Sequence, residues 1–344
     1  MFRTLLFLLV TLTVPATAAQ QSLSGEAATA VVKETIRLVR QNYVFAAKVD
    51  PIAVKLEQQL TAGRYGVTDP QQLATRLTED LQAVTSDKHM SVKFNPEQAA
   101  GLRGPRVAGN DAFRQQQMVS SNYGVSEMKV LPGNVRYVNI SPGFFWDPAR
   151  SPQVLDDAMR FLSGGDAYIL DIRTNGGGSP ATVRYVVSHF MDPGQKLMTY
   201  HIGPEQTSES RTGPVPAGRL PAKPLYLLTS SRSASAAEEF AAHIKNFKLG
   251  KLVGATTAGA GHRNSLFGTP EGFVVSVSVG TAIHPVTGTG WEGTGVVPDV
   301  AVPAAEALDV AHADALKDLV AKTTGPQKVE LQKALDGLAA KKQQ

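Results

Sequence analysis

The chain has 344 residues, of which 42% are hydrophobic and 19% charged, a balance typical of a folded globular protein with a substantial core. Its formal net charge of +4 comes from scattered lysines and arginines, not from a basic cluster with interleaved aromatic residues, which argues against nucleic-acid binding. Because the sequence contains no cysteine, disulfides, a thiol nucleophile and thiolate metal sites are excluded.

The first 19 residues have the pattern of a secretory signal peptide. Met1-Phe2-Arg3 provides a positive start, Leu5–Val14 is apolar but too short to span a bilayer, and Pro15–Ala19 supplies small residues at the spacing of a cleavage site. No later stretch is apolar for long enough to cross a membrane. We therefore expect an exported protein, bacterial periplasmic or extracellular, with no stable membrane insertion once the signal is removed.

Residues 20–95 are predicted to form a small helical domain. Apolar residues recur on one helical face from Gly25 to about Val84, and Asp69-Pro70 has the pattern of an N-cap followed by proline at the first helical position. The motif Asp87-Lys88-His89 follows the last helix. Met90–Phe94 then alternates apolar and polar residues, as a short strand does.

Residues 96–124 lack a sustained period and are predicted to be a linker or loop, whereas residues 125–303 alternate between strand and helix patterns. This alternation predicts an α/β core. Residues 304–344 are expected to form two helices, broken at Thr324–Pro326. The elements expected in the core are strands at Val135–Ile140, Ala167–Ile172, Leu225 and Val253, helices at Pro152–Leu162, Pro180–Phe190 and Ala236–Phe247, and an antiparallel pair at Phe273–Val277 and Thr281–His284.

A run of small residues between a strand and a helix makes Ser235 a candidate nucleophile. The apolar run Pro224–Leu228 is followed by Ser231–Glu239, where the helix begins. Such a turn directs one side chain outward and leaves the first helical N–H groups unpaired beside it, which are two components of an acyl-transfer site. The alternative is structural, because Ser235-Ala-Ala-Glu238 is also a capping box, and capping boxes are commoner than catalytic serines.

A second strand–turn–helix segment, Leu170–Pro180, contains three successive glycines. Ser179 is a candidate N-cap with Pro180 after it, and Gly176–Gly178 would allow close backbone approach and could turn amides toward one point. The spacing matches neither the dinucleotide-binding nor the phosphate-binding glycine motif. An anion hole and a structural turn both remain open for this segment.

Among the seven histidines, His89 is the candidate general base. His262, in the polar loop Thr256–Asn264, is the rival, and His243 is a weaker one because it lies within the helix that Ser235 opens. Glu292 lies in a loop rich in Gly, Pro and Trp. It could orient a histidine or a water, or it could be a solvated loop carboxylate.

Three motifs together resemble the C-terminal processing peptidase family, which includes the tricorn protease core and interphotoreceptor retinoid-binding protein. They are Ser-Ala-x-Glu opening a helix at Ser235, Asp-x-Arg-x-Asn-Gly-Gly-Gly at Asp171, and Glu-Gly-x-Gly-Val-x-Pro-Asp at Glu292. The resemblance spans roughly residues 25–305. It implies a crotonase-like α/β spiral core preceded by the small N-terminal helical domain.

Within that family, the resemblance is to the tricorn-like and retinoid-binding-protein-like branch. The tail-specific branch uses a Ser–Lys dyad, but this chain has Ala260 at the lysine position and no lysine between Lys251 and Lys317. The stretch from His89 to Tyr123 is also too short for the PDZ domain that those proteases carry. Asp87-Lys88-His89 instead resembles the Asp-x-His motif of the tricorn-like branch.

The resemblance assigns roles residue by residue. It implies Ser235 as nucleophile, His89 as general base and Glu292 as the acidic residue that completes the site, with Ala236 and Gly177 or Gly176 as oxyanion-hole donors and Gly178 and Asn175 as substrate contacts. The tricorn core has a serine that bridges its histidine to its glutamate, and Lys88 stands there in this chain. Asp87, Ser91 or a water are the candidates to replace it.

The implied function is that of an exported serine peptidase, which hydrolyses a peptide or protein substrate through an acyl-enzyme without a metal or organic cofactor. The alternative is a non-catalytic protein on the same fold that binds an apolar ligand, as a retinoid or lipid carrier does, or a peptide. The two differ in whether Ser235 and His89 come within reach of each other. The oligomeric state is left open.

Overall fold

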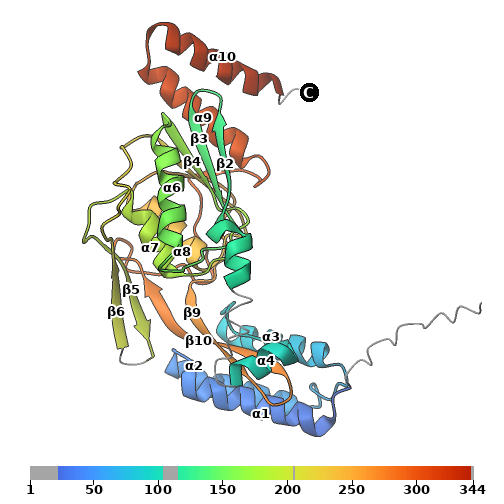
Figure 1. Ribbon diagram of the computed structural model, residues 1–344. Helices are drawn as coiled ribbons and strands as arrows, with labels where there is room; N and C mark the ends of the chain where they lie inside the picture. The colour runs from blue at the N-terminus through green and yellow to red at the C-terminus, as the bar shows by residue number, and fades with distance from the viewer. Residues whose placement is uncertain (1–21, 104–114, 204–205, 342–344) are drawn as a thin grey trace, which may run out of the picture.

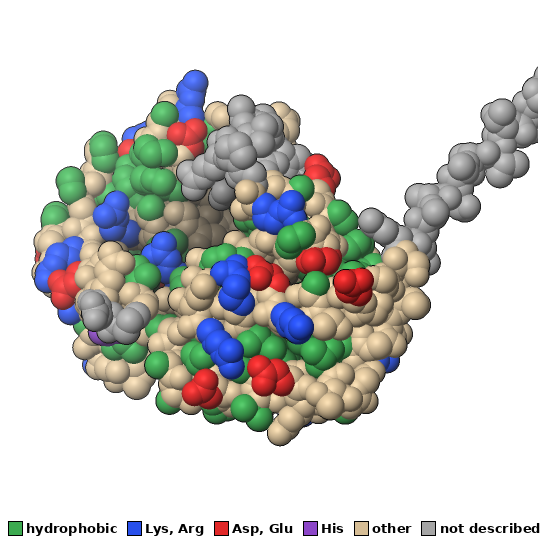
Figure 2. Space-filling view, turned by 90° about the horizontal axis from the view of Figure 1, so that it is seen from below, with side chains coloured by type: hydrophobic (Ala, Val, Ile, Leu, Met, Phe, Trp, Pro, Cys, Tyr) green, Lys and Arg blue, Asp and Glu red, His purple; other side chains and the backbone are tan. Residues whose placement is uncertain are grey.

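The structure is a computed structural model that describes residues 22–103, 115–203 and 206–341, so the predicted signal peptide lies outside it. The N-terminal helices and the C-terminal helices occupy opposite ends of the molecule, with two sheets between them (Figure 1). On the face seen from below, lysine and arginine side chains are interspersed with acidic and hydrophobic ones (Figure 2). Among the described residues, no helix combines the length and apolar composition needed to span a membrane.

The N-terminal region contains the predicted helices, α1 (Gly25–Asn42), α2 (Ala46–Thr61) and α3 (Pro70–Thr85). The Asp69 side chain accepts from the Gln71 N–H with Pro70 at the first turn, so the predicted cap is confirmed. The buried faces of these helices form one hydrophobic cluster that also contains Phe273 from a strand of the core. Each fully buried apolar side chain contributes about 1.5–3 kcal/mol. The N-terminal helices are therefore packed firmly against the core.

The first sheet is antiparallel. It has the order β1-β10-β5-β6, with β9 also paired to β10. Its strands are β1 (Ser91–Phe94), β5 (Lys196–Ile202), β6 (Gln206–Arg211), β9 (His262–Gly268) and β10 (Phe273–Ile283). The predicted pair at 273–277 and 281–284 is wrong, because β10 continues through both segments. Gly280 marks a register shift rather than a turn, and a Cβ there would lie 2.6 Å from the His201 carbonyl oxygen.

The second sheet has the order β11-β8-β7-β4-β3-β2, parallel from β11 to β3, with β2 as an antiparallel edge. Every residue of β4 and β7 is buried, as expected of strands covered on both faces. Apart from the pair at 273–277 and 281–284, the predicted core strands and helices are thus confirmed. The strands are β2 (Val125–Leu131), β3 (Val135–Ile140), β4 (Ala167–Asp171), β7 (Leu225–Thr229), β8 (Lys251–Gly254) and β11 (Val300–Ala301).

Helices cover both faces of this sheet, as one hydrophobic cluster on each side of it shows. The first group is α6 (Ser151–Ser163), α7 (Pro180–Ser188) and α8 (Ala236–Asn246), and the second is α9 (Ala307–Lys322) with α10 (Gly325–Lys341). The loops after the parallel strands β4, β7 and β8 leave the same edge of the sheet, which is where ligands bind in open α/β folds.

The segment expected to be a linker contains regular structure. Residues Pro96–Arg103 form α4, and Asn122–Gly124 form a short 3₁₀ turn, η1. Ala99 of α4 is fully buried beneath β9, where a Cβ on Gly268 would lie 2.1 Å from the Ala99 carbonyl oxygen. Glycine in β9 therefore allows the helix to pack directly against the strand.

Candidate active site

Ser235 lies in the turn between β7 and α8 with a strained backbone. Its φ is 54° and its ψ is −118°, outside the regions that residues other than glycine normally adopt. Such a conformation costs about 1–3 kcal/mol and persists only where surrounding contacts enforce it. One half of the predicted capping box is present, because the Ser235 N–H donates to Glu238 Oε2 at 2.9 Å. Capping and a strained, half-buried turn thus coexist at this residue.

The glycine turn after β4 packs directly against Ser235. A Cβ on Gly177 would lie 2.8 Å from the Ser235 Cβ and 2.7 Å from the Ala234 carbonyl oxygen, so no larger residue fits without displacement. The Ala234 N–H donates to the Asn175 carbonyl oxygen at 3.1 Å. The structure therefore brings together the two strand–turn–helix motifs that the sequence singled out.

The amides predicted as oxyanion donors differ in availability. The Gly176 N–H donates to the Pro142 carbonyl oxygen and the Gly177 N–H to Asn175 Oδ1, each at 2.9 Å. The Ala236 and Gly178 N–H groups have no acceptor among the described residues. In this conformation Ala236 and Gly178 are therefore the two free donors.

Asn175, predicted as a substrate contact, is fully buried. Its Nδ2 donates to the Ile140 carbonyl oxygen at 3.0 Å, while its Oδ1 holds the Gly177 amide. The side chain therefore shapes the glycine turn from inside the protein.

His89 lies in the loop between α3 and β1. Asp87 Oδ1 accepts the His89 N–H at 2.9 Å, which fixes the backbone of this loop. The ring is largely buried, and its Nδ1 has no hydrogen-bond partner among the described residues but lies 3.9 Å from Glu292 Oε2. Burial lowers the pKa of His89 from 6.5, although the nearby charges of Glu292 and Asp87 oppose the shift. A neutral imidazole, the form a general base needs, is therefore favoured.

Glu292 is anchored by backbone amides. Its carboxylate accepts N–H groups from Lys88 at 3.2 Å, Gly261 at 2.5 Å and His262 at 2.8 Å. A solvated loop carboxylate would lack these bonds. Glu292 therefore joins the His89 loop to the segment that opens β9.

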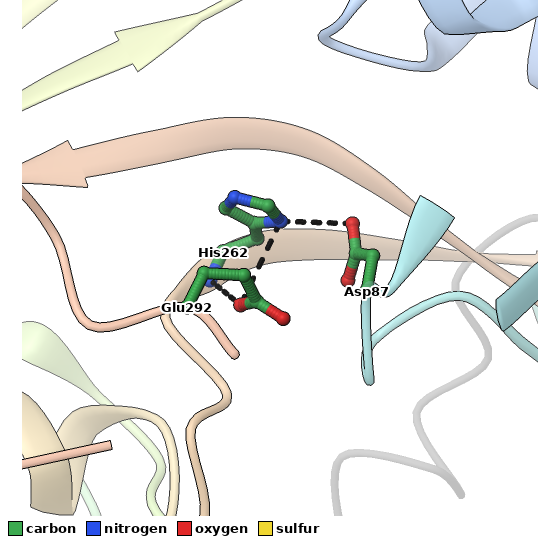
Figure 3. A group of neighbouring side chains, drawn as sticks. All are labelled: Asp87, His262 and Glu292. Carbon is green, nitrogen blue, oxygen red and sulfur yellow. Dashed lines mark hydrogen bonds and ion pairs between the residues drawn. The ribbon is translucent and has the colours of Figure 1, made fainter. Parts of the chain in front are cut away.

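The structure pairs Asp87 with His262, the rival base. Their carboxylate and Nδ1 are 2.8 Å apart, and Glu292 Oε2 lies 3.6 Å from the same nitrogen (Figure 3). Burial opposes ionisation of Asp87, yet the hydrogen bond and charge of His262 outweigh it and hold the pKa of Asp87 below its usual value. Asp87 thus contacts His89 through the backbone and His262 through the ring. Sequence reasoning missed this pair because its members are 175 positions apart.

Asp87, His262 and Glu292 also have ligand atoms within 4.8 Å of one another, a donor set that could suit a transition metal. Their lone pairs are already used, however. Glu292 Oε2 accepts two backbone N–H groups, and the Asp87 carboxylate accepts the His89 N–H and faces the His262 Nδ1. The arrangement fits a hydrogen-bonded network better than a cation site.

The remaining candidates lie apart from this cluster. His243 is buried in α8, where its ring stacks on Phe247 at 5.7 Å and lies 5.2 Å from the His284 ring. Ser91 lies in β1, in register with Ser276 of β10, and makes no hydrogen bond to His89 in the described part of the chain. Packing in the helix accounts for His243, as the sequence indicated.

Ser235 and His89 are brought to one region but are not joined. In the described part of the chain, no hydrogen bond links the Ser235 hydroxyl to His89 or His262. His89 does experience the charge of Glu238, the residue that holds the Ser235 amide. The candidate base and nucleophile thus belong to one electrostatic environment.

A cleft of about 810 Å³ begins beside the free Gly178 amide. Its walls include Phe145, Trp146 and Met118. Trp146 is held by the Tyr185 ring, with centroids 5.7 Å apart. The cleft therefore offers apolar and aromatic surface next to Gly178, one of the two candidate oxyanion donors.

Comparisons with known proteins identify the family and the fold of the chain. Residues 134–302 match the family model of peptidase family S41, and residues 22–126 match that of the N-terminal domain of S41 peptidases in eukaryotic IRBP. A carboxyl-terminal-processing protease from Picosynechococcus sp. is 31% identical over 144 residues, covering 41% of this chain and 33% of the relative. The match thus spans about a third of that relative's length.

Solved structures show the same fold. Mature CPAF aligns with a TM-score of 0.59 at 13% identity, covering 91% of this chain and 98% of CPAF. The tricorn protease aligns with a TM-score of 0.53 at 16% identity, covering 92% of this chain and 37% of tricorn. The crotonase-like α/β core with a helical N-terminal region is therefore confirmed. The chain belongs to peptidase family S41, the C-terminal processing peptidase family.

Proposed function

We propose that this protein is a serine peptidase that hydrolyses peptide or protein substrates through an acyl-enzyme, with Ser235 as nucleophile and His89 as general base. The observation that carries the proposal is the packing of the strained Ser235 turn against Gly177, in a region where the Ala236 and Gly178 N–H groups have no acceptor among the described residues. Membership of a peptidase family supports the same reaction.

The chemistry follows from these positions. His89 takes the Ser235 proton as the hydroxyl oxygen attacks the substrate carbonyl, and the Ala236 and Gly178 N–H groups hold the oxyanion of the tetrahedral intermediate. His89 then gives the proton to the leaving amine, and water hydrolyses the acyl-enzyme by the same route. Glu292, beside His89 Nδ1, stabilises the imidazolium while it exists.

The substrate class follows from the cleft at Gly178. An extended peptide whose scissile carbonyl faces Ala236 and Gly178 would extend along the walls formed by Phe145 and Trp146. We therefore propose that a large apolar side chain near the scissile bond improves turnover. The N-terminal signal pattern supports export to a bacterial periplasm or the extracellular space as part of this proposal.

The test is covalent labelling of the mature protein with a fluorophosphonate probe. The wild type should be labelled, while Ser235→Ala and His89→Ala should not, because groups that act as a unit lose activity together. Circular dichroism and thermal unfolding would show that both variants are folded.

The result that overturns the proposal is labelling that survives Ser235→Ala. If a folded wild type is not labelled and instead binds a fluorescent apolar ligand, the carrier function replaces the peptidase. The lack of a hydrogen bond between Ser235 and His89 in this structure is the observation that keeps this alternative under test.

A further inference from the structure

Glu238 is a fully buried carboxylate in the first turn of α8, and no lysine or arginine is paired with it among the described residues. Four donors surround it instead. Oε2 accepts the N–H groups of Ser235 at 2.9 Å and Ala260 at 2.8 Å, and Oε1 accepts the Thr257 hydroxyl and the Gly259 N–H, both at 2.6 Å. A capping role needs only the first of these bonds. The other three require a separate explanation.

The bond to Ser235 acts on the strained turn. Ser235 has a positive φ, and its N–H is held by Glu238 at the start of the helix. The backbone angles of Ser235 decide where its side chain points and where the following Ala236 N–H points. Glu238 therefore helps to orient both the nucleophile and one free oxyanion donor.

The other three bonds act on the loop between β8 and β9. Ala260 directly precedes Gly261 and His262, whose N–H groups hold Glu292. The Ala258 carbonyl oxygen in the same loop accepts from the Lys88 ammonium group, next to His89. Through these contacts, Glu238 connects the Ser235 turn to the loop that holds Glu292 and that accepts a hydrogen bond from Lys88.

We propose that Glu238 is a positioning residue that sets the geometry between Ser235 and the Glu292–His89 side of the site. This inference rests on the proposed peptidase function. It assigns to the glutamate of the Ser-Ala-x-Glu motif a role beyond capping. The Glu238 carboxylate holds both the turn after β7 and the loop after β8, two neighbouring strands of the sheet.

The decisive variant is Glu238→Gln, which keeps the shape but directs an amide N–H₂ at donors. A displacement of about 1 Å at a reacting centre costs on the order of 100-fold in rate. We therefore expect the phosphonylation rate and kcat to fall about 100-fold, with KM changed by less than about 3-fold. The matched control is Glu239→Gln, also buried and next in sequence, whose carboxylate accepts from the Tyr200 hydroxyl and contacts neither loop.

A second readout separates positioning from simple destabilisation. Burial lowers the pKa of His89, and the charge of Glu238 opposes this less than those of Glu292 and Asp87 do, so Glu238→Gln should move the acid limb of kcat/KM slightly to lower pH. A structural role alone would not shift this limb. Kinetics are measured well below the melting temperature of each variant, so that the folded fraction is the same.

Thr257→Val is the fallback if Glu238→Gln does not fold. It removes the hydroxyl that donates to Glu238 Oε1 and that also accepts the Val296 N–H at 2.7 Å, and it leaves the side chains of Glu238 and Ser235 intact. For the lost bond to Glu238, of about 1 kcal/mol, we expect phosphonylation to slow by about 3- to 10-fold, with the folded fraction checked by thermal unfolding. If the wild type is labelled and the folded variants react at the wild-type rate, the positioning role of Glu238 is overturned and the proposed peptidase function is not affected. An unlabelled wild type instead overturns the proposed function.

Discussion

Replacing Gly177 with alanine tests whether the glycine turn and the Ser235 turn are packed as tightly as the structure shows. The new Cβ would meet the Ser235 Cβ at 2.8 Å and the Ala234 carbonyl oxygen at 2.7 Å, and Gly177 has a φ of 103°. A left-handed backbone costs an L-residue about 1–2 kcal/mol, and overpacking costs about 1–3 kcal/mol. We expect the free energy of unfolding to fall by about 2–5 kcal/mol.

Gly194→Ala is the matched control, because its φ of 83° is also left-handed but no atom lies within 4 Å of the added Cβ. It should lose only the backbone contribution of about 1–2 kcal/mol. Urea unfolding measures both variants, and fluorophosphonate labelling should slow on the order of 100-fold in Gly177→Ala alone, since Ser235 must move. If the two variants have the same free energy of unfolding, and Gly177→Ala is labelled at the wild-type rate, the packing of Gly177 against Ser235 is refuted.

Three further predictions concern the histidines and the acidic cluster. Burial, and then the charge of His243, lowers the pKa of His284 to about 3, so the unfolded chain binds more protons than the folded protein between about pH 3 and 6.5. The free energy of unfolding should therefore rise with pH in this range, by at most about 1.4 kcal/mol per pH unit. His284→Asn should flatten that slope, as measured by urea unfolding at several pH values. His262→Asn should retain at least a tenth of the labelling rate, whereas His89→Ala should lose about 10³-fold or more; the reverse order would make His262 the base. Dialysis against a chelator should leave labelling unchanged, because the Asp87 carboxylate oxygens are already used by the His89 N–H and the His262 ring. Loss of labelling that is restored by adding a metal ion would show a resident metal.

Elements buried on both faces were predictable from the sequence. The strands β4 and β7 are continuous apolar runs, and each is followed by small residues and a helix start that the structure confirms at Ser179 and Ser235. β6 gave no signal, because Gln206–Arg211 is a polar edge strand that is exposed along most of its length. The continuity of β10 was missed because serines and a glycine within it have turn propensity, which pairing on both sides overrides.

At the candidate site, the sequence indicated which motifs meet but not how their atoms are used. Neighbouring parallel strands end at one edge, so the approach of Gly177 to Ser235 was within reach of pattern reasoning. The use of the Gly177 amide depends on one rotamer of Asn175, and no sequence pattern specifies it. The Asp87–His262 pair depends on how two distant segments pack, which only the tertiary structure determines.

The packing also limits how Ser235 and His89 can meet. His89 is followed directly by β1, whose residues pair with β10, and the N-terminal helices share a hydrophobic cluster with β10. Lys88 is bonded to both Glu292 and the Ala258 carbonyl oxygen. A large swing of the N-terminal helices would break all of these contacts at once. If Ser235 and His89 act together as proposed, we therefore expect their approach to come from movement of the side chains and not from a swing of the N-terminal helices.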